Sequence, residues 1–195
     1  MEEIIASRLL PFCGHKLGTI YGKRGSLYIR QKASAFQHLS TEYSGVLVLT
    51  DFRDSGEACV PAALEEYIHK RTPSLPGTFL LRFAVNEIES WLLADRIGIA
   101  RYLGIALSRV PLQPEKEQFP KRTLVNLAGF SRKKQIRNGF APPLGHHAEV
   151  GPEYLSLLQG FITNIWDIEV AMSHANSLER CVRRLRLLSE NANEI

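Results

Sequence analysis

The chain has 195 residues, of which 45% are hydrophobic, and a formal net charge of +4 at pH 7. This length supports one substantial core, so we expect one domain with an appendage and not two equal domains. No run of eighteen apolar residues occurs, and the acidic start from Met1 to Ile4 differs from a basic signal peptide. We therefore expect a cytoplasmic protein that does not bind membranes.

The cysteines Cys13, Cys59 and Cys181 are odd in number and lie far apart along the chain. They form neither a C-x-x-C pair nor a spacing that is typical of zinc sites. We expect them to be reduced and to act as small apolar residues.

The first half of the chain alternates between helical and strand-like patterns. The apolar spacing predicts, in chain order, a helix over 2–12, a strand over 18–21, a helix over 27–39, a strand over 45–50, a helix over 57–71, a strand over 78–85 and a helix from 87. The runs at 45–50 and 78–85 are continuously apolar, which is typical of strands that are covered on both faces. This order predicts a doubly wound, mainly parallel α/β sheet in which 45–51 and 78–85 are neighbouring parallel strands.

After residue 105 the pattern changes to proline-rich segments and helices. Residues 108–150 contain no strand-like run and predict two short helices, near 120–129 and 131–138. The tail from 153 to 190 is predicted to be helical, with a break around 163–167. We therefore divide the chain into an α/β core (1–105) and a basic, helical C-terminal extension (106–195).

Positive charge is concentrated in this second half. No acidic residue occurs between Gln118 and Ala148, and a second basic cluster extends from Arg180 to Arg186. A solvated helix face and a face that binds the phosphates of nucleic acid both remain open as interpretations. The candidates for nucleic-acid binding in the first cluster are Lys121, Arg122, Arg132, Lys133, Lys134 and Arg137.

Carboxylates follow both of the apolar runs. Asp51 and Asp54 come after the first run, and Glu87 and Glu89 come after the second. Sites in open parallel sheets lie beyond the carboxyl ends of the strands, so the four side chains can converge on Mg²⁺ or Mn²⁺ and support phosphodiester hydrolysis. In the alternative interpretation Asp54 caps the following helix, and the two glutamates occupy a helix start, where the helix dipole favours them.

Three segments resemble a known family. The run from Gly45 to Gly56, the string from Glu87 to Asp95 and the segment from Pro120 to Leu124 resemble the DUF4276 family, and the resemblance covers most of the chain. Its most specific part is the acid-x-Trp-Leu-Leu-Ala-Asp string. That family is similar to RloB-like and OLD-type proteins with Toprim-like domains, which are often linked to phage defence. The resemblance implies a Toprim-like fold and Mg²⁺ chemistry on phosphodiesters.

The resemblance also implies roles for individual residues. Asp51 and Asp54 match the metal-binding aspartate loop, Glu89 matches the glutamate before the tryptophan, and Lys121 matches the proline–lysine pair. The aspartate loop reads Asp-x-x-Asp here, whereas a Toprim domain has Asp-x-Asp.

A second departure concerns the start of the chain, where no strand with a glutamate precedes the first helix. Glu2 or Glu3 would then have to stand in for the metal-binding glutamate of a Toprim domain. We expect either upstream coding sequence that restores this strand or a member that has lost the metal-binding glutamate. Two hypotheses follow. The first is a Mg²⁺-dependent, Toprim-like nuclease or phosphotransfer enzyme that acts on nucleic acid in antiviral defence, with Asp51, Asp54 and Glu89 as catalytic residues. The second is a non-catalytic binding module of a defence complex, partnered with an ATPase or another protein of the defence system.

Overall fold

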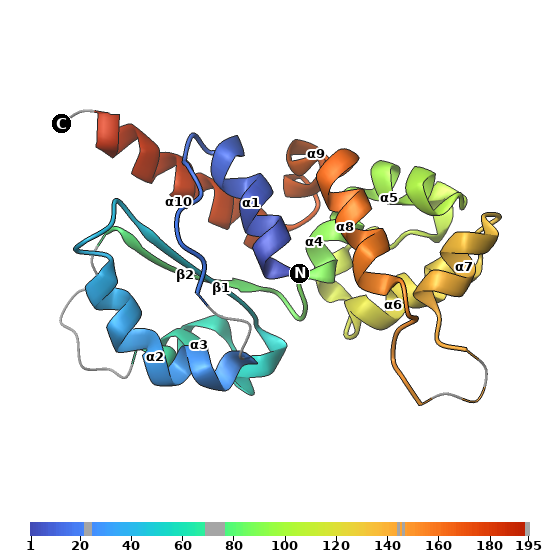
Figure 1. Ribbon diagram of the computed structural model, residues 1–195, viewed down its shortest axis with the longest axis horizontal. Coiled ribbons are helices and arrows are strands. Elements are labelled where there is room, and N and C mark those ends of the chain that lie inside the picture. The colour runs from blue at the N-terminus through green and yellow to red at the C-terminus, as the bar shows by residue number, and fades with distance from the viewer. Residues whose placement is uncertain (22–24, 69–76, 144, 146, 194–195) are drawn as a thin grey trace.

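The computed structural model describes residues 1–21, 25–68, 77–143, 145 and 147–193. In this part the protein is mixed α/β and mostly helical, with a small parallel sheet of strands β1 (Val46–Asp51) and β2 (Phe79–Ala84) (Figure 1). The helices are α1 (Glu2–Phe12), α2 (Gly25–Leu39), α3 (Val60–Tyr67), α4 (Glu89–Ala94), α5 (Arg96–Leu103), α6 (Pro120–Gly129), α7 (Lys134–Phe140), α8 (Tyr154–Asn164), α9 (Ile168–Met172) and α10 (Asn176–Asn193). None of the helices in the described residues combines the length and the apolar character that crossing a bilayer requires.

The two strands are neighbours and parallel, which confirms the prediction for these apolar runs. Their register extends from Val46 opposite Phe79 to Asp51 opposite Ala84. Side chains alternate between the two faces of a strand. Leu47 accordingly packs in the cluster that contains residues of α1 and α10, whereas its neighbour Val48 packs in the cluster formed with α2 and α3. The sheet is therefore covered on both faces, with α1 and α10 on one side and α2 and α3 on the other (Figure 1).

Several predicted elements in the first half differ from the structure. Residues 18–21 form no strand, so the strand predicted there is wrong. The helix predicted over 57–71 is shorter, because Gly56 takes a left-handed conformation (φ 73°) and Cys59 is extended, so α3 begins only at Val60. Residues 69–71 of that prediction lie outside the described residues. The helix predicted from 87 begins at Glu89.

The helical second half agrees more closely with the sequence pattern. The predicted helix over 120–129 is confirmed as α6. The next helix begins at Lys134 and not at 131, because the Ser131 hydroxyl accepts a hydrogen bond from the Lys133 N–H and holds a turn there. The predicted break in the tail is confirmed between α8 and α9, where the Asp167 carboxylate accepts the Val170 N–H and begins α9.

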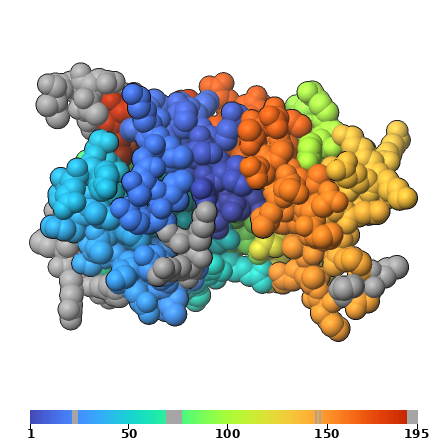
Figure 2. All heavy atoms as spheres, in the orientation of Figure 1, coloured from blue at the N-terminus to red at the C-terminus, as the bar shows by residue number. Residues whose placement is uncertain are grey.

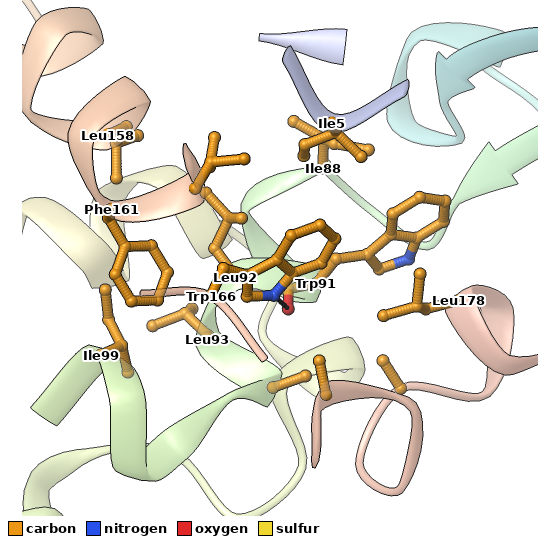
Figure 3. Close-up of a cluster of buried hydrophobic side chains, with 14 of the residues drawn as sticks. Ile5, Ile88, Trp91, Leu92, Leu93, Ile99, Leu158, Phe161, Trp166 and Leu178 are labelled. Atoms are coloured by element: carbon orange, nitrogen blue, oxygen red, sulfur yellow. Dashed lines mark hydrogen bonds between the residues drawn. The ribbon is translucent and has the colours of Figure 1, made fainter. Parts of the chain in front are cut away.

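The main hydrophobic cluster contains residues from both halves of the chain. Trp91 and Trp166 lie at its centre, and the Trp166 indole donates a hydrogen bond to the Trp91 carbonyl at 3.2 Å (Figure 3). Ile5 of α1 and Leu178 of α10 flank them. On the surface, the atoms of α1 and α8 meet along the middle of one face (Figure 2). The first and last helices therefore pack on the same core as α4.

Candidate functional site

The carboxyl edge of the sheet brings together the polar residues that follow the two strands. After β2 the chain turns at Asn86, which has a left-handed conformation (φ 61°) that is uncommon for a residue other than glycine. The Asn86 side-chain amide donates to the carbonyls of Glu115 and Glu117, and these bonds hold the turn. The turn places the Ile88 N–H 2.8 Å from Oδ1 of Asp51, the last residue of β1.

Asp51 is a half-buried carboxyl group surrounded by other acids. Burial is the main reason that the pKa of Asp51 rises from 3.8 to about 8. The charges of Glu89, Glu2 and Asp54 raise this pKa further, whereas the hydrogen bond from the Ile88 N–H lowers it. The structure therefore brings the Asp51 carboxylate within electrostatic reach of the predicted Glu89, and also of Glu2.

Glu89 is the most buried acid of the site, with 1% of its surface exposed. Its Oε1 accepts a hydrogen bond from the Tyr154 hydroxyl at 2.8 Å and lies 4.0 Å from the Lys121 ammonium. Its Oε2 is buried and has no hydrogen-bond partner among the described residues. Burial raises the pKa of Glu89, and the Lys121 charge and the Tyr154 hydrogen bond oppose that rise.

Glu87 holds two segments of the protein together. Its Oε1 accepts a hydrogen bond from the Arg53 guanidinium at 2.9 Å, and its Oε2 accepts the backbone N–H of Lys121 at 2.9 Å. Lys121 is the second residue of α6, so Glu87 satisfies one of the free N–H groups at that helix start. Both oxygens of Glu87 thus have protein donors, and the helix that it supports is α6 and not the neighbouring α4.

Asp54 lies apart from the buried acids. It is exposed on a short 3-10 helix, Arg53–Ser55, and its backbone carbonyl accepts a hydrogen bond from Arg30 at 2.9 Å. Its side chain does not cap α3, because the N-cap of that helix is Cys59. Asp54 therefore reaches the site only through its charge, which is the weakest of the influences that raise the pKa of Asp51.

The predicted basic residues divide into those whose side chains contact other groups of the protein and those that are exposed. Lys121 faces the acids: burial alone would lower its pKa, but the charges of Glu89, Glu87, Asp51 and Glu149 outweigh burial and raise it. The Lys133 ammonium donates to the Tyr102 carbonyl at 2.7 Å, and Arg137 donates to the Ser131 carbonyl. Three basic residues are exposed and form no such hydrogen bond to another described residue, and they are Arg122, Arg132 and Lys134.

The acids of the site can be tested as ligands for a cation. Among the described residues, no three His, Cys, Asp or Glu side chains are grouped so as to hold a metal ion. Mg²⁺, however, is commonly held by only one or two carboxylates, with water and substrate phosphates as the remaining ligands. Asp51 and Glu89 fit that smaller set, because Asp51 accepts the Ile88 N–H through Oδ1 only, and Oε2 of Glu89 has no donor in the part of the chain that the structure describes. Glu87 and Asp54 fit less well, since Glu87 is engaged by protein donors and Asp54 lies apart.

Sequence reasoning missed two residues that complete the site, Tyr154 and Arg53. Tyr154 is separated from Glu89 by 65 positions, and nothing in the local pattern connects them. Arg53 lies inside the predicted aspartate loop, and an arginine between two aspartates is a signal that could have suggested an acidic partner on the next strand end.

Comparisons with models of protein families, with curated proteins and with solved structures found no match to this chain.

Proposed function

We propose that the chain is a Toprim-like, Mg²⁺-dependent enzyme that acts on nucleic-acid phosphodiesters, with Asp51 and Glu89 as the cation ligands. The observation that supports this proposal best is the buried Oε2 of Glu89, which has no hydrogen-bond donor among the described residues. A buried carboxylate oxygen without a donor is costly, and a divalent cation supplies the missing positive charge. When bound, Mg²⁺ or Mn²⁺ would polarise a phosphodiester and lower the pKa of a water ligand. The resemblance of the strand-end segments to DUF4276 supports the same chemistry and extends the proposal to phage defence.

The surrounding residues support this role in different ways. The Tyr154 hydroxyl orients Glu89 by binding Oε1, which leaves Oε2 for the cation. Lys121 lies near Oε1 and partly neutralises the acids before a cation binds. The exposed side chains of Arg122 and Lys134 then contact the backbone phosphates of the nucleic acid, as the basic cluster predicts.

The cation site can be tested by calorimetric titration with Mn²⁺, combined with cleavage assays on single- and double-stranded DNA and RNA. We expect the parent protein to bind Mn²⁺ and Asp51→Asn to lose at least about tenfold in affinity, because one of two protein ligands is replaced. The matched control Asp54→Asn removes a nearby charge that is not a ligand, and it should bind almost as the parent does. Equal Mn²⁺ affinity in the parent and Asp51→Asn would contradict the proposal.

A second candidate is a non-catalytic module that binds nucleic acid within a defence complex, together with an ATPase or another defence protein. The observation that favours it is that the protein itself already engages these charges. Both oxygens of Glu87 accept protein donors, the Arg53 guanidinium and the Lys121 N–H, and the Lys121 ammonium lies 4.0 Å from Oε1 of Glu89. This candidate predicts nucleic-acid binding that is unaffected by Mn²⁺ and by Asp51→Asn.

The nucleic-acid face can be tested separately from the metal. Arg122→Ala and Lys134→Ala should each weaken binding similarly on all sequences and flatten the salt dependence by about one unit of slope. Arg183→Ala removes an exposed arginine of the other basic cluster and serves as the matched control. Unchanged affinity in Arg122→Ala combined with Lys134→Ala would identify this cluster as an ordinary solvated surface.

A further inference from the structure

The outer edge of β1 carries backbone N–H and C=O groups that have no hydrogen-bond partner among the described residues. The Val46 N–H donates to the Thr78 carbonyl at 2.9 Å, and the Phe52 N–H donates to the Ala84 carbonyl at 2.8 Å. The backbone N–H and C=O groups of the even-numbered residues of β1 therefore point toward β2. Because the backbone of a strand alternates with a period of two, the N–H and C=O groups of Leu47 and Leu49 point toward the opposite edge. Within the described part of the chain, no hydrogen bond joins these outward groups to another segment.

A cavity of about 500 Å³ follows this edge. Its walls include residues from both faces of β1, so the cavity extends around the edge of the strand and not only over one face. Four large apolar or aromatic side chains that line it remain 40–53% exposed, and they are Leu17, Ile20, Tyr21 and Tyr43. Exposed apolar residues that gather around one groove indicate a surface that is covered by a partner.

The chemistry of the groove specifies the shape of its occupant. A row of alternating N–H and C=O groups along an apolar strand is satisfied by the backbone of another strand, whereas a compact apolar ligand would leave these groups unpaired. An edge strand of this kind is the usual template for strand addition. We propose that the outer edge of β1 is a docking site for an extended segment of a partner protein, which adds to the sheet as a third strand.

The charges around the groove indicate which segment fits. At the carboxyl end of β1 the lining residues include the acids Glu2 and Asp54. The other end of the groove lies against α10. There His15 contacts the carbonyl of Leu185, and Leu188 of the same helix lies near Gly45, directly before β1. A segment with alternating apolar residues and a lysine or arginine at the acidic end therefore complements the groove, whereas an acidic residue at that end would be repelled.

Amide hydrogen exchange measured by NMR tests this proposal directly. In the free protein the amides of Leu47 and Leu49 should exchange quickly, while those of Val48 and Thr50 are protected by the bonds to β2. The probe is a synthetic seven-residue peptide of alternating valine and threonine with a C-terminal lysine. At nine times its Kd, nine tenths of the protein is occupied, so exchange at Leu47 and Leu49 should slow by about tenfold. The same peptide with proline at its centre cannot form a regular strand and should give no such protection.

A pair of variants in the protein completes the test. Ile20→Asp places a charge in the groove and should weaken peptide binding by about tenfold or more, whereas Leu112→Asp changes an equally apolar, exposed residue elsewhere and should not. Three results would overturn the proposal. They are slow exchange at Leu47 and Leu49 in the free protein, equal binding of the proline peptide, and protection of these amides that grows with protein concentration alone, which would make a second copy of the chain the occupant.

Discussion

Replacing Asp51 by Asn makes the acidic cluster measurable through the pH dependence of stability. The variant keeps the side-chain oxygen that accepts the Ile88 N–H but removes the carboxyl group whose pKa burial and Glu89 raise to about 8. In the unfolded chain an aspartate titrates near 3.8. Between about pH 4 and pH 8, unfolding of the parent therefore releases a proton, and its free energy of unfolding falls as the pH rises through this window.

The expected size of the effect follows from the single proton that Asp51 releases on unfolding. Each pH unit within the window changes the free energy of unfolding by about 1.4 kcal/mol, so the parent should lose about 3 kcal/mol relative to Asp51→Asn between pH 5 and pH 7. Urea denaturation of both proteins at several pH values, with a chelator present, measures this difference. The two proteins should have similar stability at about pH 3, below both pKa values, where the carboxyl group is largely protonated in the folded and the unfolded state. Parallel pH profiles from pH 4 to pH 8 would refute the account of Asp51 as a buried acid with a raised pKa.

The same two proteins also separate a cation site from a purely structural carboxylate. At pH 7 and a Mg²⁺ concentration ten times the parent Kd, the parent should gain about 1.4 kcal/mol, which is RT ln(1 + [Mg²⁺]/Kd). Asp51→Asn, with an affinity at least about tenfold weaker, should gain about 0.4 kcal/mol or less. A structural Asp51 predicts the reverse pattern, in which the parent does not respond to Mg²⁺ and the variant loses about 1 kcal/mol at every pH. Thermal melts with and without Mg²⁺ distinguish the two patterns, and the second pattern would exclude the proposed cation site.

Two further predictions concern the packing around the site. Tyr154→Phe removes the hydroxyl that donates a hydrogen bond to buried Glu89, and it should lower the free energy of unfolding by about 2 kcal/mol in urea titrations. The control Tyr102→Phe removes a hydrogen bond to a backbone carbonyl and should lower the free energy of unfolding by about 1 kcal/mol. Equal losses would show that Glu89 does not depend on the hydroxyl. Gly98→Ala places a Cβ against the carboxylate that caps α5 and should cost about 1–3 kcal/mol, but Gly129→Ala meets no atom within 4 Å and should be neutral or slightly stabilising in thermal melts. A stable Gly98→Ala variant would show that this cap can move.

The strands could be predicted from the sequence where the pattern depends on burial alone. The continuous apolar runs that became β1 and β2 are covered by helices on both faces, and this environment is what such runs indicate. The prediction failed at residues 18–21, because a short run does not become a strand without backbone partners. There the chain passes the open edge of β1 without hydrogen-bonding to it, and Ile20 and Tyr21 remain partly exposed. Backbone pairing between distant segments is a tertiary property that local periodicity does not contain.

The basic cluster shows a similar limit for charge. The sequence correctly places the basic residues of α6 and α7 on helices, but Arg132 and Lys133 precede α7, and the pattern cannot tell which side chains face the protein. Lys133 packs its stem near Gly104 and directs its ammonium group to a backbone carbonyl, and Lys121 turns toward the acids. A count of lysines and arginines therefore overestimates the surface that is available for phosphates, and the exposed Arg122 and Lys134 are the better test of nucleic-acid binding.

For Glu89 the sequence contained more information than the strand-end argument used. Trp91, Leu92 and Leu93 spread apolar side chains over most of the circumference of α4, and every residue of this helix is buried. A glutamate in the first turn of such a helix must be buried as well, and a buried carboxylate requires donors or a cation. The local pattern thus establishes that Glu89 needs partners, but only the fold identifies the Tyr154 hydroxyl and the Lys121 ammonium group as two of them. Among the described residues Oε2 of Glu89 still has no donor, so a cation shared with the neighbouring Asp51 would meet the rest of that requirement.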